Sequence, residues 1–584
     1  MRIKRKTEEK KISISKNIAR LAVTAGLTAA LSFGGVMAPV TMAFAENVAA
    51  PANSITIKKN TDNGDVRYKA YQIFKADVID GDNGKVVSNI DWASPEAKTA
   101  VLGYLSGVTD SGITVNSSAQ EAAKYLTEHS AGTGETTPVD NNNLFNGLAK
   151  AVENSVNQTG ASFAAGQVFQ PKDASGNALQ GYYLFVTDAS TLGTDQNPKK
   201  NTGTSPIFAV VGDAFVTVTE KTSIPTVNKQ ILDDTKGKTA DKATTDDWKN
   251  VGDAWIGQVI DYKLTGTVAS NIATYGKYTY EFQDHLSAGL AADLNSIVVT
   301  INGKKIAESG YYTATVTDIK DASNKKTGQD LKVSFTDLKD AAKSVDETLN
   351  GSSQVVVTYQ AQLTSDAEYT AAGNTNKVKL VYSNDPMSNG TGTSESKKVA
   401  DYVFGFNVTK TDPDNPSANL VAGFKVKMIK EGATNEVAKW LKKDGSFTDD
   451  ENQADTFETT GEGNTVFIPG LVAGTYQISE SKTPAGYNTI ADFKITVTPT
   501  YDPTTGKLTN LEVTDTSDMV STNLNGKVES TKIPVTIQNK KGSGLPLTGL
   551  NGVTFTWIAG GAVLCIGVAH LIRSRKQAEE SEQE

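Results

Sequence analysis

Short runs of alternating apolar and polar residues, separated by turn residues, recur along most of this chain. Clear examples are residues 54–57, 181–186 and 214–219, and Gly, Asn and Asp are frequent between such runs. Successive side chains of a strand point to opposite faces, so this alternation places the apolar side chains of each run on one face. The spacing of runs and turns predicts a mainly β protein built from tandem sandwiches.

Helical periodicity is confined to the first third of the chain. It appears in residues 95–104, 118–128 and 143–154, which predicts short helices beside the first sheet. A stretch rich in Ser, Gly and Thr at residues 387–396 separates later β segments. The predicted divisions are an N-terminal domain of residues 46–220, a middle domain of residues 221–400 and a C-terminal domain of residues 401–541.

The N-terminus has the three parts of a secretory signal peptide. Residues 1–20 are rich in Lys and Arg, residues 21–40 are mostly small and apolar, and Ala43-Phe44-Ala45 precedes Glu46. This order predicts a signal peptide of residues 1–45 that is cleaved between Ala45 and Glu46. The mature chain is therefore expected outside the cytoplasmic membrane.

The C-terminus, residues 542–584, carries a second targeting pattern. It reads Leu545-Pro546-Leu547-Thr548-Gly549, then an apolar run at 550–572, then Arg573-Ser574-Arg575-Lys576. The apolar run is long enough to span a bilayer as a helix, and the basic end would stay in the cytoplasm. This order resembles the LPxTG sorting signal read by sortases of Gram-positive bacteria. The resemblance implies cleavage between Thr548 and Gly549, transfer of Thr548 to an amine, and only transient membrane contact.

Composition excludes several classes of function. A net charge of −9, without a basic cluster in the mature region, argues against nucleic-acid binding. His129, His285 and His570 lie far apart, so no metal site, cofactor site or turnover enzyme is expected. The one cysteine, Cys565, lies in the C-terminal apolar run. The mature chain therefore has no disulfide, and an extracellular protein of this kind needs another restraint.

In each of three strands of the C-terminal domain, a row of apolar side chains on one face is followed by a single polar side chain on the same face. The groups are Lys410 after Phe404, Phe406 and Val408; Glu480 after Tyr476 and Ile478; and Asn539 after Ile533, Val535 and Ile537. An unpaired buried Lys or Glu is costly, so these groups are expected to meet. One arrangement is a buried ion pair with an amide beside it, and the other is covalent.

The covalent arrangement follows from the chemistry of buried groups. A desolvated Lys loses its proton more easily, and a desolvated Glu holds its proton more tightly. Neutral Lys410 could attack the side-chain carbonyl of Asn539 while Glu480 shuttles protons. Ammonia would leave, and an amide would join the first strand to the last.

Residues 476–487, Tyr-Gln-Ile-Ser-Glu-Ser-Lys-Thr-Pro-Ala-Gly-Tyr, resemble the E-box of collagen-adhesin B-type (CnaB) domains of Gram-positive pilins. The E-box reads Y-x-L-x-E-x-x-x-P-x-G-Y, and Ile478 stands at its Leu position. The resemblance implies an immunoglobulin-like sandwich in which Glu480 promotes an isopeptide bond between Lys410 and Asn539.

The middle domain repeats this pattern. Lys229 interrupts an apolar face in the first strand, and Asn384 ends the face of Val378, Leu380 and Tyr382 in the last strand. Residues 282–290 resemble the F-x-D-x-L-S-x-G-L segment of collagen-adhesin A-type (CnaA) domains. The resemblance implies that Asp284 promotes a bond between Lys229 and Asn384, with Asp261 as a competing acid.

The first domain shows no such trio, and no internal bond is predicted there. Its last strand is followed by Lys221, which shares a face with threonines and is expected to be exposed. Residues 216–221 partly match the pilin motif V-x-V-Y-P-K, with Thr-Glu in place of Tyr-Pro. The resemblance implies that Lys221 is the intersubunit nucleophile, and Lys199 and Lys200 are the alternatives.

The mature chain as a whole resembles sortase-assembled backbone (major) pilins, the fimbrial subunits of Gram-positive bacteria. The resemblance implies an extracellular covalent fibre of identical subunits, anchored to the peptidoglycan of the cell wall and supporting adhesion. The expected partners are a sortase, neighbouring subunits, peptidoglycan and host-surface ligands. The alternative is a monomeric LPxTG wall-anchored adhesin, which shares every feature except the linking lysine.

Overall fold

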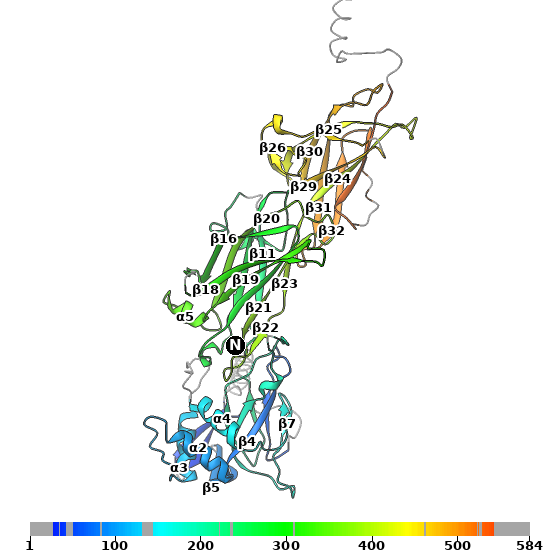
Figure 1. Cartoon of the computed structure of the whole chain (residues 1–584). Coiled ribbons are helices and arrows are strands. Elements are labelled where there is room, and N and C mark those ends of the chain that lie inside the picture. Colours follow the sequence, from blue (N-terminus) through cyan, green and yellow to red (C-terminus); the bar gives the residue numbers. More distant parts are fainter. Residues whose placement is uncertain are drawn as a thin grey trace, which may run out of the picture. The chain divides into compact units, whose positions relative to one another are not determined.

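The structure is a computed structural model of the chain (Figure 1). It describes residues 27–33, 36–42, 51–81, 84–130, 144–194, 196–220, 222–233, 237–307, 310–460, 463–522, 524 and 528–541. Contacts divide the chain into one unit of Met1–Val403 with Tyr501–Thr509 and another of Phe404–Thr500 with Asn510–Glu584. The predicted signal cleavage site at Ala45 and Glu46, Lys221 and the whole sorting signal lie outside the described residues.

In the described residues, the first part of unit 1 contains a large sheet, a small sheet and three α-helices. The large sheet has the order β2-β1-β5-β4-β8-β9 with β6 paired to β4, and the small sheet has the order β10-β3-β7. The strands are β1 (Leu27–Phe33), β2 (Val36–Met42), β3 (Ile55–Lys58), β4 (Arg67–Gly81), β5 (Gly84–Trp92), β6 (Phe163–Ala164), β7 (Val168–Phe169), β8 (Gly181–Thr187), β9 (Ile207–Val211) and β10 (Val216–Thr219).

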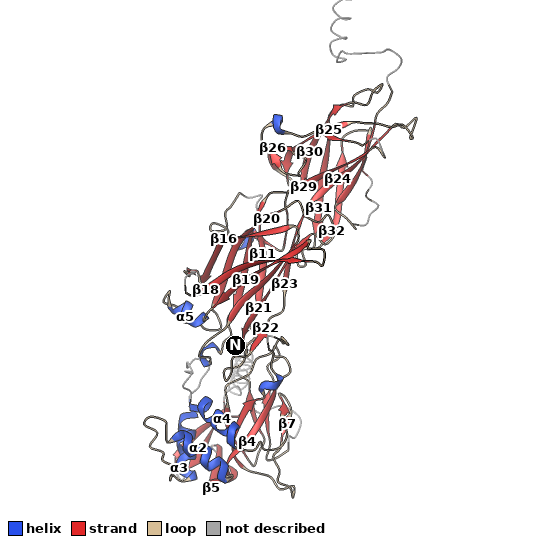
Figure 2. Cartoon of the chain, in the orientation of Figure 1, coloured by secondary structure: helices blue, strands red, loops and turns tan. Residues whose placement is uncertain are grey.

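The predicted helices are confirmed as α2 (Pro95–Leu105), α3 (Ala119–Ser130) and α4 (Leu144–Ser155). Helix α2 begins where it does because Ser94 Oγ accepts a hydrogen bond from Ala97 N at 3.1 Å and Pro95 occupies the first turn. Figure 2 shows these helices gathered beside β4 and β5. Their apolar faces and one face of the large sheet form a common core that includes Val101, Leu126 and Leu148. A short 3-10 helix, η1 (Ala189–Thr191), follows β8.

The second part of unit 1 is a sandwich of two sheets, with orders β12-β11-β14-β20-β16-β17 and β13-β23-β21-β15-β19-β18, and β22 paired to β21. Its strands are β11 (Val227–Leu232), β12 (Trp248–Lys249), β13 (Val251–Asp253), β14 (Val259–Thr267), β15 (Tyr280–Ser287), β16 (Leu290–Ile301), β17 (Lys304–Lys305), β18 (Tyr312–Lys320), β19 (Lys326–Phe335), β20 (Gln354–Leu363), β21 (Asn374–Ser383), β22 (Thr391–Thr393) and β23 (Lys397–Tyr402). The short helices are η3 (Thr245–Asp247), η4 (Ile272–Thr274) and α5 (Leu338–Lys343).

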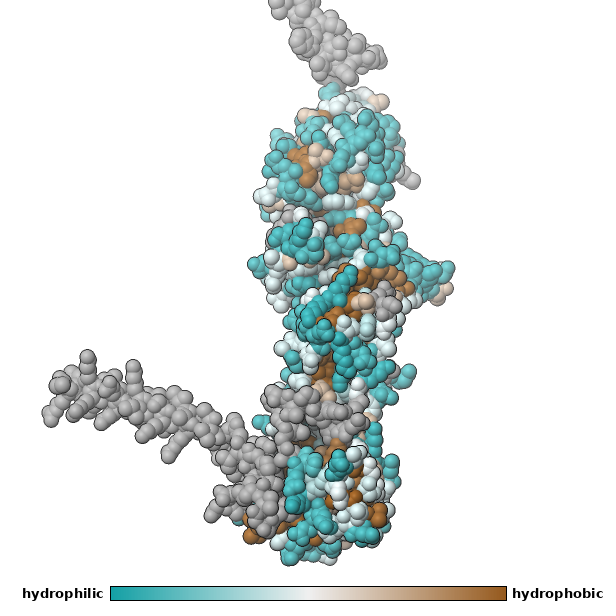
Figure 3. Space-filling view, turned by 90° about the vertical axis from the view of Figure 1, so that its left-hand side faces the viewer, coloured by the Kyte–Doolittle hydropathy of each residue, from teal (hydrophilic) through white to brown (hydrophobic). Residues whose placement is uncertain are grey.

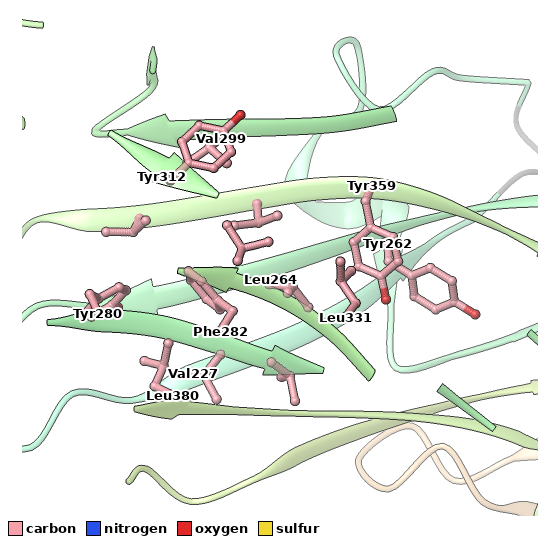
Figure 4. Packing of buried hydrophobic residues seen from close by; sticks show 14 of the residues in the cluster. Val227, Tyr262, Leu264, Tyr280, Phe282, Val299, Tyr312, Leu331, Tyr359 and Leu380 are labelled. Atoms are coloured by element: carbon pink, nitrogen blue, oxygen red, sulfur yellow. The ribbon is translucent and has the colours of Figure 1, made fainter. Parts of the chain in front are cut away.

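The sandwich core is built from the inward positions of both sheets. Leu264 of β14 lies in one cluster with Phe282 of β15 and Leu380 of β21 (Figure 4). Inward and outward positions alternate along β14 and β20 as the period-two pattern predicts. This alternation decides which polar side chains of the same strands enter the interior.

Unit 2 contains two sheets, with orders β29-β24-β34-β33 and β27-β26-β25-β30-β31-β32, and β28 paired to β25. The strands are β24 (Phe404–Thr411), β25 (Gly423–Glu431), β26 (Asn435–Leu441), β27 (Phe447–Thr448), β28 (Phe457–Glu458), β29 (Thr465–Leu471), β30 (Gly474–Lys482), β31 (Phe493–Tyr501), β32 (Leu508–Asp515), β33 (Val520–Thr522) and β34 (Lys532–Gln538), and η5 spans Glu451–Gln453. The first strand, β24, pairs in parallel with the last, β34, so Lys410 lies opposite Ile537.

The face of the molecule in Figure 3 carries both hydrophilic and hydrophobic residues. In the view of Figure 3, hydrophilic residues alternate with small hydrophobic patches. The exposed large hydrophobic residues are Ile79, Val115, Val168, Val259, Leu294 and Val421. Among the residues that the structure describes, no helix is long and apolar enough to cross a membrane. The predicted span at 550–572 lies outside them.

Candidate functional site: two buried lysine–acid–asparagine clusters

The C-terminal unit brings together the three side chains that the sequence predicted would meet. Lys410 ends the inward face of β24, Glu480 that of β30, and Asn539 directly follows β34. Lys410 and Asn539 are fully buried and Glu480 is 8% exposed. Lys410 Nζ donates a hydrogen bond to Asn539 Oδ1 and lies 3.4 Å from Glu480 Oε1. Asn539 Nδ2 donates to Glu480 Oε1 at 3.1 Å and to Oε2 at 3.2 Å.

The electrostatics of this cluster make the Lys410 amine easier to deprotonate than an exposed lysine. Burial lowers the pKa of Lys410 to about 8, although the nearby Glu480 carboxylate opposes this shift. Glu480 is held in place because its Oε2 also accepts hydrogen bonds from Ile490 N at 3.0 Å and from Thr483 Oγ1 at 3.3 Å. A nucleophilic nitrogen, a side-chain amide and a proton-transfer group therefore share one buried site.

The middle sandwich holds a second buried lysine–acid pair. Lys229 of β11 and Asp284 of β15 are 1% and 2% exposed, and Lys229 Nζ donates to Asp284 Oδ2 at 2.5 Å. Burial lowers the pKa of Lys229 to about 8, against the opposing charge of Asp284. The competing acid, Asp261, occupies an outward position of β14 and accepts a hydrogen bond from Gln360 Nε2 at 3.0 Å. Asp284 is therefore the acid beside Lys229.

The structure does not bring Asn384 to Lys229, so the predicted pairing of these two residues is wrong. Asn384 lies beyond the end of β21, where its Nδ2 donates to Gly193 O at 3.0 Å. The backbone carbonyl of Asn384 accepts hydrogen bonds from Gly203 N at 2.6 Å and from Thr202 Oγ1 at 3.0 Å. Asn384 thus fastens the end of β21 to the segment of residues 193–203, away from the lysine.

The amide near Lys229 belongs to Asn376, which the sequence analysis missed. Asn376 is fully buried in β21, and its Nδ2 donates to the Tyr359 hydroxyl at 2.6 Å. The same hydroxyl accepts from Lys229 Nζ at 3.1 Å and donates to Asp284 Oδ2 at 2.6 Å. A signal for Asn376 exists, because it stands two residues before Val378 and shares its face.

Lys85, in the N-terminal part of unit 1, is a buried lysine that sequence reasoning also missed. Lys85 is fully buried, lies 2.8 Å from Asp80 Oδ1 and donates to Gly212 O at 2.5 Å and Ala214 O at 3.2 Å. Its described partners are a carboxylate and two backbone carbonyls, so no side-chain amide stands in the position of Asn539. The absence of an internal bond in this domain stays a prediction.

The residue between β10 and Lys221 is held by hydrogen bonds to the rest of the domain. Glu220 is buried and accepts hydrogen bonds from the Tyr68 hydroxyl at 2.6 Å and Asn60 N at 2.9 Å. The alternative lysines are engaged locally: Lys199 Nζ donates to Thr191 O at 3.0 Å, and Lys200 Nζ lies 3.4 Å from Glu395 Oε1.

The cluster of the C-terminal unit lies largely within a region of known fold. Residues 405–511, which include Lys410 and Glu480, match the protein family described as SpaA, a prealbumin-like fold domain. The trypsin-resistant surface T6 protein of Streptococcus pyogenes serotype M6 is 23% identical over 273 residues. That match covers 46% of this chain and 44% of the relative, so the aligned region spans less than half of the relative's length.

Solved structures of backbone pilins are also similar to this chain. The T6 backbone pilin of S. pyogenes serotype M6 aligns with a TM-score of 0.45 and 15% identity, covering 85% of this chain and 100% of that chain. The major pilin SpaA of Corynebacterium diphtheriae aligns with a TM-score of 0.42 and 13% identity, covering 84% and 99%.

Proposed function

We propose that this chain is the structural backbone subunit of a covalent, sortase-polymerised pilus whose domains are locked by internal Lys–Asn isopeptide bonds. The observation that carries the proposal is the contact of Lys410 with Asn539 and Glu480 in a buried site between the first and last strands of unit 2. The cluster around Lys229 gives the same proposal independent support in a second sandwich.

The proposed reaction in unit 2 is an exchange of amines that needs no cofactor. The neutral Nζ of Lys410 attacks Cγ of Asn539, and the Nζ–Cγ bond forms. Glu480 accepts a proton from Nζ and delivers one to Nδ2, and the Cγ–Nδ2 bond breaks with loss of ammonia. Glu480 lies within 3.4 Å of both nitrogens, so one carboxyl serves both transfers. The middle and C-terminal domains would each react once, so the protein would not be a turnover enzyme.

The bond in unit 2 would restrain the chain where tension passes through it. Lys410 and Asn539 are 129 positions apart, at the entry and exit of the sandwich. By analogy with a disulfide, closing a loop of this size stabilises the fold by about 5 kcal/mol. Tension applied to the two ends of the domain would be borne by the covalent amide bond rather than by the hydrogen bonds between β24 and β34. This property suits a fibre without disulfides.

We further propose that sortase cleaves after Thr548 and that Lys221 of the next subunit accepts the Thr548 acyl group. Repetition of this step gives a head-to-tail fibre. Transfer of the last subunit, at the base of the fibre, to peptidoglycan attaches the fibre to the outside of the cell. The LPLTG segment, the apolar run and the basic tail support this step. The similarity of the chain to a streptococcal surface protein is in keeping with an extracellular location. Adhesion to host surfaces would follow from the exposed position of such a fibre.

The proposed fibre predicts a ladder of very large species when wall extracts are run on a denaturing gel, and replacing Lys221 with alanine should abolish that ladder. The reason is that no other lysine of a neighbouring subunit would accept Thr548, so only single subunits on peptidoglycan would remain. Lys199→Ala and Lys200→Ala are the matched controls, and both should leave the ladder intact. A ladder that persists in Lys221→Ala but disappears in either control would move the linkage to that control lysine.

The same gel separates the pilin from a monomeric wall-anchored adhesin. An adhesin would carry Thr548 on peptidoglycan only and would run as a single species after the wall is digested. A ladder in the unaltered protein excludes that alternative.

A further inference from the structure

The two clusters differ in how the acid reaches the leaving nitrogen. In unit 2, Glu480 contacts Asn539 Nδ2 directly at 3.1 Å. In the middle sandwich, Asp284 contacts the amine of Lys229 at 2.5 Å, but within the described residues no hydrogen bond joins Asp284 to Asn376. A proton accepted by Asp284 therefore needs a carrier to reach Asn376 Nδ2.

The hydroxyl of Tyr359 stands between these groups. It donates to Asp284 Oδ2 at 2.6 Å, and it accepts from Asn376 Nδ2 at 2.6 Å and Lys229 Nζ at 3.1 Å. Tyr359 takes this position because it occupies an inward site of β20, after Val355 and Val357. Each group that takes part in the proposed bond is thus one hydrogen bond from this oxygen.

Packing fixes the Tyr359 ring. Figure 4 shows Tyr359 beside Tyr262 of the neighbouring strand β14, and their rings stack with centroids 5.3 Å apart and planes 20° from parallel. The Tyr262 hydroxyl donates to Asp401. In the described part of the chain, no hydrogen bond joins Tyr262 to Lys229 or Asp284. Tyr262 therefore supports the ring of Tyr359, and its hydroxyl also forms a hydrogen bond with Asn376.

The protonation state of Tyr359 suits a donor. Burial and the neighbouring charge of Asp284 raise the pKa of the Tyr359 hydroxyl well above its ordinary value. The hydroxyl thus keeps its proton at physiological pH. Oδ1 of Asn376 has no hydrogen-bond partner within the described residues.

We propose that Tyr359 is a catalytic residue of bond formation in the middle domain, where it relays a proton from Asp284 to Nδ2 of Asn376. The inference rests on the proposed internal bonds and extends them. The Nζ–Cγ bond forms, and the Nζ proton passes to Asp284. Once Cγ is tetrahedral, Nδ2 has a lone pair that accepts the Tyr359 proton. Asp284 then reprotonates Tyr359, the Cγ–Nδ2 bond breaks, and ammonia leaves.

The test compares two hydroxyl deletions in residues 46–548. Tyr359→Phe removes the relay, and Tyr278→Phe is the matched control, because the fully buried Tyr278 hydroxyl has no hydrogen-bond partner among the described residues. Each chain is made by cell-free synthesis, denatured at intervals and digested. Linked peptides are then quantified for Lys229 with Asn376 and, as an internal control, for Lys410 with Asn539.

The relay predicts that Tyr359→Phe slows the Lys229–Asn376 bond about 100-fold. The Lys410–Asn539 bond should form at the unaltered rate, and Tyr278→Phe should leave both rates unchanged. A wild-type rate for the Lys229–Asn376 bond in Tyr359→Phe overturns the inference and leaves the proposed bonds standing.

Folding is checked by trypsin digestion beside Asp284→Asn, which keeps the shape of the acid and cannot form the bond. If trypsin degrades Tyr359→Phe while Asp284→Asn resists, Tyr359 serves packing and the catalytic role is overturned. Resistance of both variants supports the relay. If the unaltered chain yields neither linked peptide, the proposed internal bonds fail, and the relay fails with them.

Discussion

Replacing Glu480 with glutamine should lower the unfolding temperature of the C-terminal domain by about 15 °C. Glutamine keeps the size of the side chain but cannot accept the proton from Lys410, so the bond to Asn539 would not form. The loss of a cross-link worth about 5 kcal/mol accounts for the size of the shift. Calorimetry of residues 401–541 within the full mature chain measures it.

Glu458→Gln is the matched control for this experiment. Glu458 pairs with Lys482 at 2.8 Å on the surface of the same unit, where both side chains are about half exposed. A surface ion pair contributes at most about 1 kcal/mol, so this variant should unfold close to the unaltered temperature. Equal unfolding temperatures for Glu480→Gln and the unaltered chain would show that Glu480 does not control a stabilising bond.

Replacing Asn376 with alanine should abolish the cross-link of the middle domain, whereas Asn384→Ala should retain it. Asn376 reaches Lys229 through a single hydroxyl, and Asn384 donates instead to Gly193. Mass spectrometry of digested protein should find the peptide of Lys229 joined to that of Asn376 in the Asn384→Ala variant only. A cross-link that is present in Asn376→Ala and absent in Asn384→Ala would show that Asn384, as the sequence predicted, is the partner of Lys229.

The C-terminal cluster could be predicted from the sequence because each polar residue ends an apolar face. Lys410, Glu480 and Asn539 follow inward positions at a spacing of two, and the strand pattern alone fixes their faces. Their common burial cost then requires that they meet. The mainly β class and the helices of the first domain followed from the same periodicities.

The partner of Lys229 could not be predicted in this way, because alternation fixes a face and not a register. The pairing of β15 with β21 sets Asp284 opposite Val378. Lys229 and Asp284 therefore lie close to the height of Asn376 along the strands, and Asn376 precedes Asn384 by about 26 Å of extended strand. Tyr359 was missed for a related reason: a tyrosine on an apolar face is ordinary core, and only the structure shows where its hydroxyl points.

The most direct test of internal cross-linking is the intact mass of the purified mature region, residues 46–548. Two Lys–Asn bonds predict a mass about 34 Da below that of the sequence, one ammonia for each bond. Glu480→Gln should restore about 17 Da of the deficit. A mass equal to that of the sequence would mean that the buried lysines rest in ion pairs and hydrogen bonds only, and would contradict the account.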